Sequence, residues 1–133
     1  MKKLFLILMI SLSVWSCKEE ELPVNNCIQV KLVVELCGQA ILQVMDPAYY
    51  GIAEDSWQKA NGDVLTHVFS TNLACQPIPY PADSSVFYVK LESQMPQTLA
   101  SCIVCKALLA HTPSTFHYVS IQTNCATDAQ PFD

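Results

Sequence analysis

The sequence predicts an all-β fold, a small antiparallel barrel or sandwich of five to six strands that disulfides staple together. Three observations carry this prediction. Apolar and polar residues alternate from Ile28 to Leu36, and a period of two indicates a half-buried strand. Further short runs are rich in β-branched and aromatic residues, which favour strands. Six cysteines are also spread through residues 27–125, an even number that is typical of a small exported domain.

The first two strands are expected to form a hairpin. One face of the first strand carries only apolar side chains, namely Ile28, Val30, Leu32, Val34 and Leu36. Cys37-Gly38-Gln39 interrupts the pattern, and Ala40 to Met45 resumes it until Asp46-Pro47. A short break that contains glycine between two strand patterns predicts a hairpin through Gly38.

Three later runs complete the predicted sheet: Val64–Ser70, with Val68 and Phe69 as core candidates, then Val86–Glu92 and Phe116–Gln122. Each combines β-branched with aromatic residues. Such strands must bury a shared face, which a barrel or a two-layer sandwich achieves. We favour a five-stranded barrel of the OB kind over a sandwich.

The connections between these strands differ in character. Residues 48–63 form a long aromatic-bearing loop in which the turn pair Asn61-Gly62 can close a small hairpin. Pro77, Pro79 and Pro81 exclude a central strand, because proline has no ladder donor. The segment Ala100–His111 fits a short helix, but it is too brief for periodicity to decide.

The first 17 residues have the order of an export signal. Met1-Lys2-Lys3 is basic, Leu4 to Val14 is uncharged and mostly apolar, and Trp15-Ser16-Cys17 follows. The apolar stretch is too short for a membrane span, which needs about 20 residues. We therefore assign residues 1–16 as a signal peptide.

The cysteine after Val14-Trp15-Ser16 resembles the lipobox of bacterial lipoproteins, although Trp15 departs from the small or aliphatic residue usual there. The resemblance implies that the Cys17 thiol carries a diacylglycerol and that the mature chain begins at this residue. A plain secreted protein with a stray cysteine is the alternative.

An acidic run follows the lipobox. Lys18-Glu19-Glu20-Glu21 resembles the lipoprotein export signal of Bacteroidota, which implies the outer, cell-surface face of the outer membrane. A plain solvated spacer is the alternative. Residues 17–26 are thus a lipidated acidic tether, 27–125 a single β domain, and 126–133 a flexible polar tail. Several acyl chains would anchor the protein stably in the membrane.

Composition limits the partners. After residue 16 the chain keeps five lysines and twelve acidic residues, so its net charge is 5 − 12 = −7, and it contains no arginine. Phosphate and base recognition depend on clusters of Arg and Lys, so nucleic acid is not expected. The same acidity argues against the domain lying flat on an anionic lipid surface.

Six cysteines remain for disulfides once Cys17 is assigned to lipid: Cys27, Cys37, Cys75, Cys102, Cys105 and Cys125. Cys27 and Cys37 flank an extended strand of roughly 33 Å, whereas a disulfide needs Cα atoms within about 7 Å. They are therefore not expected to bond each other. If Cys102 and Cys105 pair locally, Cys27 bonds either Cys75 or Cys125, and Cys37 takes the other.

Two chemical alternatives involve these cysteines. Cys102 and Cys105 have the spacing of a redox pair, which would make the protein an envelope thiol-disulfide oxidoreductase. With His111 and His117 they could instead bind zinc, although the strand pattern points His117 toward an apolar face. Neither a nucleophile elbow nor a helical zinc motif occurs.

We therefore expect a noncatalytic surface lipoprotein without metal or cofactor, a binding or structural module of the outer membrane. Its candidate contact surface is the loop with Tyr49, Tyr50 and Trp57, since aromatic residues contribute strongly at interfaces. The partner would be an envelope protein or carbohydrate. Ordinary core packing of these three rings is the competing interpretation.

Overall fold

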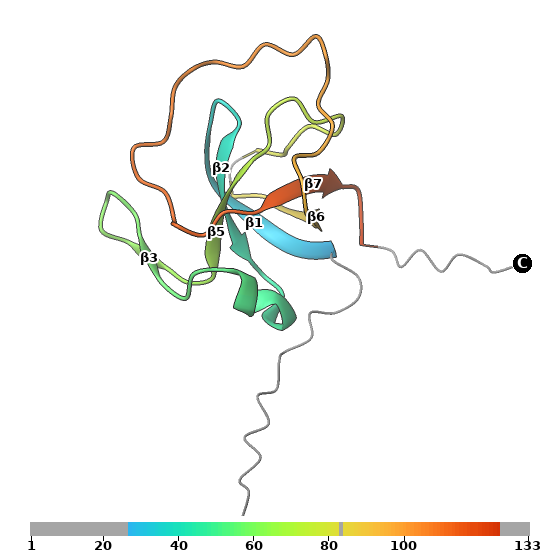
Figure 1. Cartoon of the computed structure of the whole chain (residues 1–133). Coiled ribbons are helices and arrows are strands. Elements are labelled where there is room, and N and C mark those ends of the chain that lie inside the picture. Colours follow the sequence, from blue (N-terminus) through green and yellow to red (C-terminus); the bar gives the residue numbers. More distant parts are fainter. Residues whose placement is uncertain (1–26, 83, 126–133) are drawn as a thin grey trace, which may run out of the picture.

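Five antiparallel strands form the main sheet of the computed structural model, which describes residues 27–82 and 84–125 (Figure 1). In the order of the sheet they are β5 (Val68–Asn72), β2 (Gln39–Val44), β1 (Cys27–Leu36), β6 (Val86–Glu92) and β7 (Tyr118–Gln122). The all-β prediction is confirmed. Cys17 and the predicted signal peptide, tether and tail, residues 1–16, 17–26 and 126–133, lie outside the described residues.

The rest of the regular structure lies between β2 and β5. A 3-10 helix, η1 (Pro47–Ile52), is capped at its N-terminus by Asp46, whose carboxylate accepts a hydrogen bond from the Ala48 amide. Strands β3 (Trp57–Gln58) and β4 (Val64–Leu65) then pair as a two-stranded sheet. The hairpin predicted around Asn61-Gly62 is thereby confirmed.

The edges of the main sheet approach each other without closing a barrel. Ser70 of β5 forms one parallel bridge with Phe116, just before β7. The Ser70 amide donates to the Thr115 carbonyl at 2.9 Å, and the His117 amide donates to the Ser70 carbonyl at 3.1 Å. The expected closed barrel is therefore wrong, because this contact is made by a connecting segment and not by a ladder between two strands. The fold is sandwich-like.

A side chain covers part of the outer edge of β7. The buried Gln76 amide donates through Nε2 to the Val119 carbonyl and accepts through Oε1 from the Ile121 amide, both at 2.8 Å. Nearer the start of the strand, the Thr71 hydroxyl donates to the His117 carbonyl at 2.7 Å. Side chains thus satisfy backbone groups that an open edge would leave unpaired.

The hairpin between β1 and β2 turns through Cys37 and Gly38, as predicted. Both residues have positive φ, 54° and 87°, which suits a two-residue turn between twisted strands. Glycine is also required for space, because a Cβ on Gly38 would lie 2.3 Å from the Cβ of Ala74. The Gly38 carbonyl accepts from the Leu73 amide at 2.7 Å, so the turn is fixed against the chain that follows β5.

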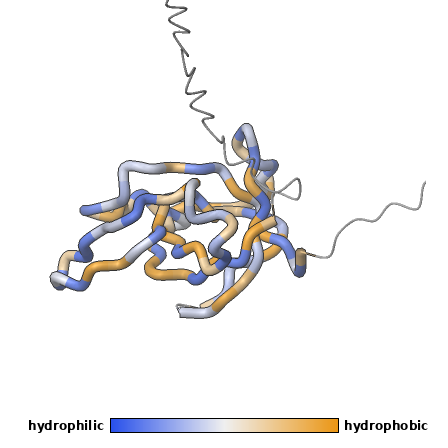
Figure 2. Tube along the Cα trace, turned by 90° about the horizontal axis from the view of Figure 1, so that it is seen from below, coloured by the Kyte–Doolittle hydropathy of each residue, from blue (hydrophilic) through white to orange (hydrophobic). Residues whose placement is uncertain are grey.

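Hydropathy along the Cα trace switches repeatedly between hydrophobic and hydrophilic (Figure 2). The buried hydrophobic side chains form two clusters, one on each face of the sheet. The larger core lies on one face and includes Ile28, Val30, Leu32, Leu42, Phe69, Phe87, Val89 and Val119. A smaller one on the other face joins Ile41, Trp57 and Val68. The β3–β4 sheet covers this smaller core, since Trp57 of β3 is part of it and Leu65 of β4 packs against it.

Two local predictions differ from the structure. The register of β1 shifts between Leu32 and Val34, so the predicted face is interrupted and Leu36 is exposed. The predicted strand Val64–Ser70 is divided into β4 and β5, since His67 has a left-handed φ of 57° that breaks extended backbone. The segment Ala100–His111, which periodicity left undecided, forms no helix.

Candidate functional site

The predicted aromatic contact surface is largely inside the protein. Tyr49, only 3 % exposed, packs in the larger core. Burial, with the nearby Asp46 carboxylate, raises the pKa of the Tyr49 hydroxyl above its ordinary value. Tyr50 is half-buried and stacks on His67 with ring centroids 3.6 Å apart. Tyr49 therefore cannot act as the exposed platform that we expected.

Trp57 is also buried, at 8 % exposure, so it too is removed from the predicted contact surface. Its ring stacks against His111 at a centroid distance of 5.3 Å. Its indole Nε1 is buried and has no hydrogen-bond partner within the part of the chain that the structure describes. The ring packs between the sheet and residues 109–111. Trp57 therefore contributes to packing inside the domain.

The six predicted cysteines form three disulfides: Cys27–Cys125, Cys37–Cys105 and Cys75–Cys102. Cys27 and Cys37 do not bond each other, as strand geometry predicted. The assumed local bond between Cys102 and Cys105 is wrong, because each reaches across to a different partner. Exchange within a Cys-x-x-Cys motif needs a bond between its own two cysteines, so this pairing gives the oxidoreductase alternative no support.

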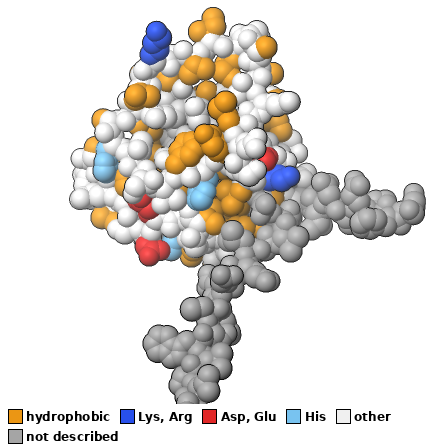
Figure 3. Space-filling view, in the orientation of Figure 1, with side chains coloured by type: hydrophobic (Ala, Val, Ile, Leu, Met, Phe, Trp, Pro, Cys, Tyr) orange, Lys and Arg blue, Asp and Glu red, His pale blue; other side chains and the backbone are white. Residues whose placement is uncertain are grey.

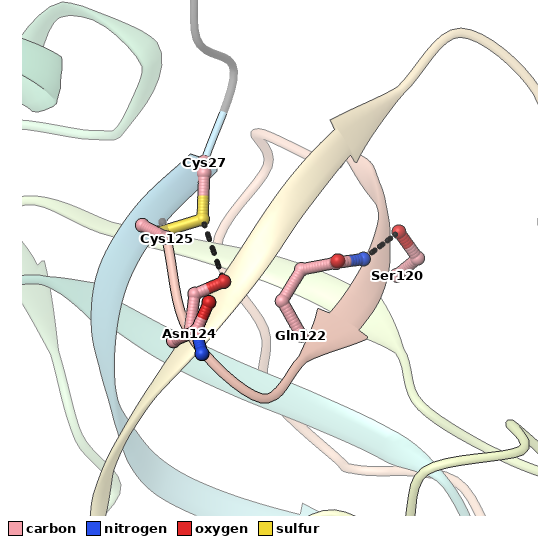
Figure 4. The surroundings of a disulfide bond; sticks show 5 residues. All are labelled: Cys27, Ser120, Gln122, Asn124 and Cys125. Atoms are coloured by element: carbon pink, nitrogen blue, oxygen red, sulfur yellow. Dashed lines mark hydrogen bonds between the residues drawn. A yellow bond between two sulfur atoms is a disulfide. The ribbon is translucent and has the colours of Figure 1, made fainter. Parts of the chain in front are cut away.

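The Cys27–Cys125 bond joins the start of β1 to the chain just after β7 (Figure 4). The Cys27 sulfur lies 3.9 Å from the Asn124 carbonyl oxygen, a van der Waals contact, since a disulfide sulfur has no proton to donate. Nearby on β7, the Gln122 amide donates to the Ser120 hydroxyl at 3.0 Å. This end of the domain is closed covalently.

The other two disulfides fasten the long connection from β6 to β7, residues 93–117, which we call the strap. Its Cys102 and Cys105 bond Cys75, which follows β5, and Cys37 of the β1–β2 turn. The Leu99 amide donates to the Cys75 carbonyl at 2.7 Å. Further along, the Leu109 amide donates to Gln39 Oε1 at 2.7 Å. The strap is thus fixed without any regular secondary structure of its own.

The strap carries the most exposed apolar side chains of the described residues. Ile103 is 96 % exposed and Leu108 72 %. Met95, Leu99 and Val104 are exposed as well. In Figure 3 hydrophobic side chains lie in the upper part of the face, where Figure 1 places the strap, and also in larger patches near its centre, whereas no acidic side chain is seen in the upper part. The strap therefore replaces the aromatic loop as the candidate contact surface.

An open groove lies beside the strap. It has a volume of about 390 Å³, and Met95, Leu99, Val104 and Tyr118 line its apolar part. A smaller pocket of about 210 Å³ lies between the strap and the β1–β2 turn. The larger volume falls at the low end of the range for small-molecule pockets, but no charged side chain lines either of them.

Glu54 fixes the last part of the strap. Its carboxylate accepts hydrogen bonds from the Ser114 hydroxyl, from the Ser114 amide at 2.6 Å and from the Thr115 amide at 3.0 Å. The hydrogen bond from the Ser114 hydroxyl is the main cause that lowers the pKa of Glu54, and the two amides and nearby His111 add to it. All three donors belong to the strap, so Glu54 acts here as a structural clamp.

The histidines of the zinc alternative are used in packing. His117 lies edge-on to Phe69, and its Nε2 is 2.6 Å from the Ile52 carbonyl oxygen. Cys102 and Cys105 are in disulfides, so they offer no thiolate. Within residues 27–82 and 84–125, no group of three or more His, Cys, Asp or Glu side chains could hold a metal ion.

The chain matches no protein-family model, no curated protein and no solved structure. None of the helices in the described part of the protein is long and apolar enough to cross a membrane. Sequence reasoning missed the strap as a surface, although the run of apolar residues around Cys102 and Cys105 was visible. It also missed Gln76 and Glu54, whose partners lie more than 40 residues away.

Proposed function

We propose that this chain is a noncatalytic lipoprotein of the outer membrane, exposed at the cell surface and anchored by acyl groups on Cys17. The folded domain is a binding or structural module held close to the bilayer. The order of basic residues, apolar stretch and cysteine in residues 1–17 supports this proposal. Three disulfides support export, since such bonds persist in oxidising compartments.

The observation that carries the proposal is the division of the cysteines. All six that follow Cys17 bond one another in pairs. No domain thiol is left for Cys17 to bond within the same molecule, so a separate role for this residue follows. Acylation is the role that its position after the apolar stretch indicates.

The anchor is tested by replacing the proposed acylated residue. Wild-type protein and Cys17→Ser are produced in a host of the Bacteroidota with labelled palmitate, and membranes are separated from soluble material. We expect the palmitate label only on the wild-type protein, and the label, not membrane association, decides whether Cys17 is acylated. A Cys17→Ser protein that stays labelled would contradict the anchor. Ser16→Ala is the matched control, because a small residue there keeps the lipobox pattern.

Surface exposure is tested separately. Glu19, Glu20 and Glu21 are replaced together by alanine in otherwise intact cells. We expect an added protease to digest the wild-type protein from outside and to spare the variant, while both remain lipidated. Equal digestion of the two proteins would contradict the proposal that the acidic run directs the protein to the cell surface. It would not affect the proposal that Cys17 is acylated.

A further inference from the structure

We propose that the strap is a second membrane contact, a surface that inserts aliphatic side chains into the interface of a lipid bilayer. This contact goes beyond the acyl anchor and does not depend on it, because it is made by residues of the folded domain. Its centre is Ile103 and Val104, which stand between two disulfide-bonded cysteines.

The first argument is exposure on a rigid support. Ile103 is 96 % exposed although it is β-branched and aliphatic. The disulfides of Cys102 and Cys105 fix the chain on either side of it, so Ile103 and Val104 cannot fold back into the core. Preorganisation of this kind lowers the entropy lost on binding. Leu99 and Leu108 extend the apolar surface along the strap.

The second argument is the distribution of charge. From Ser93 to Cys125 the chain contains no acidic residue, and within the strap Lys106 is the only lysine. The strong negative charge of the chain therefore comes from other parts of it. Two carboxylates from elsewhere in the chain adjoin this region: Glu35 accepts from the Gly38 amide in the β1–β2 turn, and Glu54 accepts from the Ser114 amide of the strap. Around Ile103 itself the strap carries one lysine beside aliphatic side chains, a composition that suits the interface of an anionic bilayer.

The third argument separates lipid from protein as the partner. Residues that dominate protein interfaces are Trp, Tyr and Arg, whereas Leu and Val are under-represented among them. The first 16 residues of the strap, 93–108, contain no aromatic residue and no arginine. Aliphatic side chains with a neighbouring lysine fit the interface of a bilayer, where binding follows buried apolar area plus attraction to anionic headgroups.

The strap lies at the end of β1 that is remote from Cys27. β1 starts at Cys27 and ends beside the Cys37–Cys105 bond, and its ten residues span roughly 33 Å. The stretch from Cys17 to Cys27 can reach about as far when extended, since each residue spans about 3.3 to 3.6 Å. An acyl anchor on Cys17, as proposed above, and the strap can therefore contact the same bilayer.

The test uses the oxidised mature chain from residue 17 with Cys17→Ser, so that no acyl group contributes. Vesicles of phosphatidylcholine, with and without phosphatidylglycerol, are floated through a density gradient. We expect this protein to float with the vesicles. Ile103→Glu with Val104→Glu should lower the bound fraction roughly tenfold, since two charges replace the inserted side chains. Lys106→Glu should lower binding only where phosphatidylglycerol is present.

The matched control is Val64→Glu, an exposed aliphatic residue of β4 outside the strap, whose bound fraction should stay unchanged. Circular dichroism and the absence of free thiols verify that each variant is folded. Failure of the parent protein to float, or equal floating of the Ile103/Val104 variant, overturns the proposal. The proposal is also overturned if the parent protein self-associates without binding vesicles and the Ile103/Val104 variant no longer self-associates. The strap would then contact a second copy of the chain. The palmitate-labelling test of the acyl anchor, made on the wild-type protein, is decided independently of these outcomes.

Discussion

The five-stranded sheet and the strap are both largely extended chain, but different interactions hold them. In the sheet, ladders join β5, β2, β1, β6 and β7, and fully buried side chains such as Phe69 and Leu42 fill the larger core. The strap has no ladder. Two disulfides, hydrogen bonds from its amides to the side chains of Gln39 and Glu54, and a few backbone hydrogen bonds to Cys75 and Ser70 hold it in place.

This difference explains how a segment can be held firmly in place and still expose apolar side chains to solvent. A segment that is fixed by its own burial has no apolar surface left to offer. The strap is fixed by covalent bonds at Cys102 and Cys105, so Ile103 between them can remain in solvent. Perturbing the sheet should therefore unfold the domain, whereas perturbing the strap should release one segment.

The largest effect is expected from Phe69→Ala. Phe69 is fully buried in the larger core, and such truncations cost about 3 to 5 kcal/mol because they leave a cavity. Urea denaturation of the oxidised protein measures the loss. Hydrogen exchange should rise in all five strands together; a rise confined to β5 would show that the sheet does not unfold as one unit.

Removing a strap disulfide ranks second. Cys37→Ser with Cys105→Ser should cost about 2 to 4 kcal/mol. Cys75→Ser with Cys102→Ser should cost about 0.8 kcal/mol less, because the loop it closes has a separation of 27 residues against 68. We expect hydrogen exchange to rise mainly in the strap. Equal loss of protection in β1 and β6 would contradict the contrast between the two regions.

Gln76→Ala affects the sheet at the edge of β7. It leaves the Val119 carbonyl and the Ile121 amide without their side-chain partner, and an unsatisfied buried group costs about 1 to 3 kcal/mol. Chemical denaturation measures the change. Gln43→Ala is the control, since Gln43 donates one exposed hydrogen bond to Thr66 and should change stability far less.

The smallest effect concerns Glu54 and depends on pH. Hydrogen bonds from the strap lower the pKa of Glu54 below its ordinary value of 4.5. Its contribution to stability is therefore fully present above pH 4.5 and is lost as the pH falls through the lowered pKa. Glu54→Gln should flatten the acid side of a stability profile, and an unchanged profile would contradict this. Asp55→Asn is a neighbouring control.

Much of the sheet could be predicted because its causes are local. The strand Val86–Glu92 has the predicted bounds, and the turn at Gly38 follows from glycine between two alternating runs. The break at His67 could not be predicted, because its left-handed backbone is imposed where one chain segment leaves one sheet and enters another. A single sequence carries no signature of that geometry.

The candidate site was less predictable, because exposure depends on what covers a residue. Trp57 and Tyr49 looked like surface aromatics within a polar loop, but tertiary packing buries both. The pairing of Cys102 and Cys105 depends on where Cys75 and Cys37 come to lie, and the two schemes considered from the sequence both supposed a local bond between them. Only the exclusion of Cys27 with Cys37 followed from strand length.

The Cys27–Cys125 disulfide has a mechanical consequence. It connects positions that are 98 residues apart in the chain, so a force that pulls residue 26 away from residue 126 passes through one covalent bond and bypasses every strand. Such a force would then load the disulfide and not the hydrogen bonds between β1 and β6. Under reducing conditions the same force would break the hydrogen bonds between β1 and β6 one after another, beginning at Cys27.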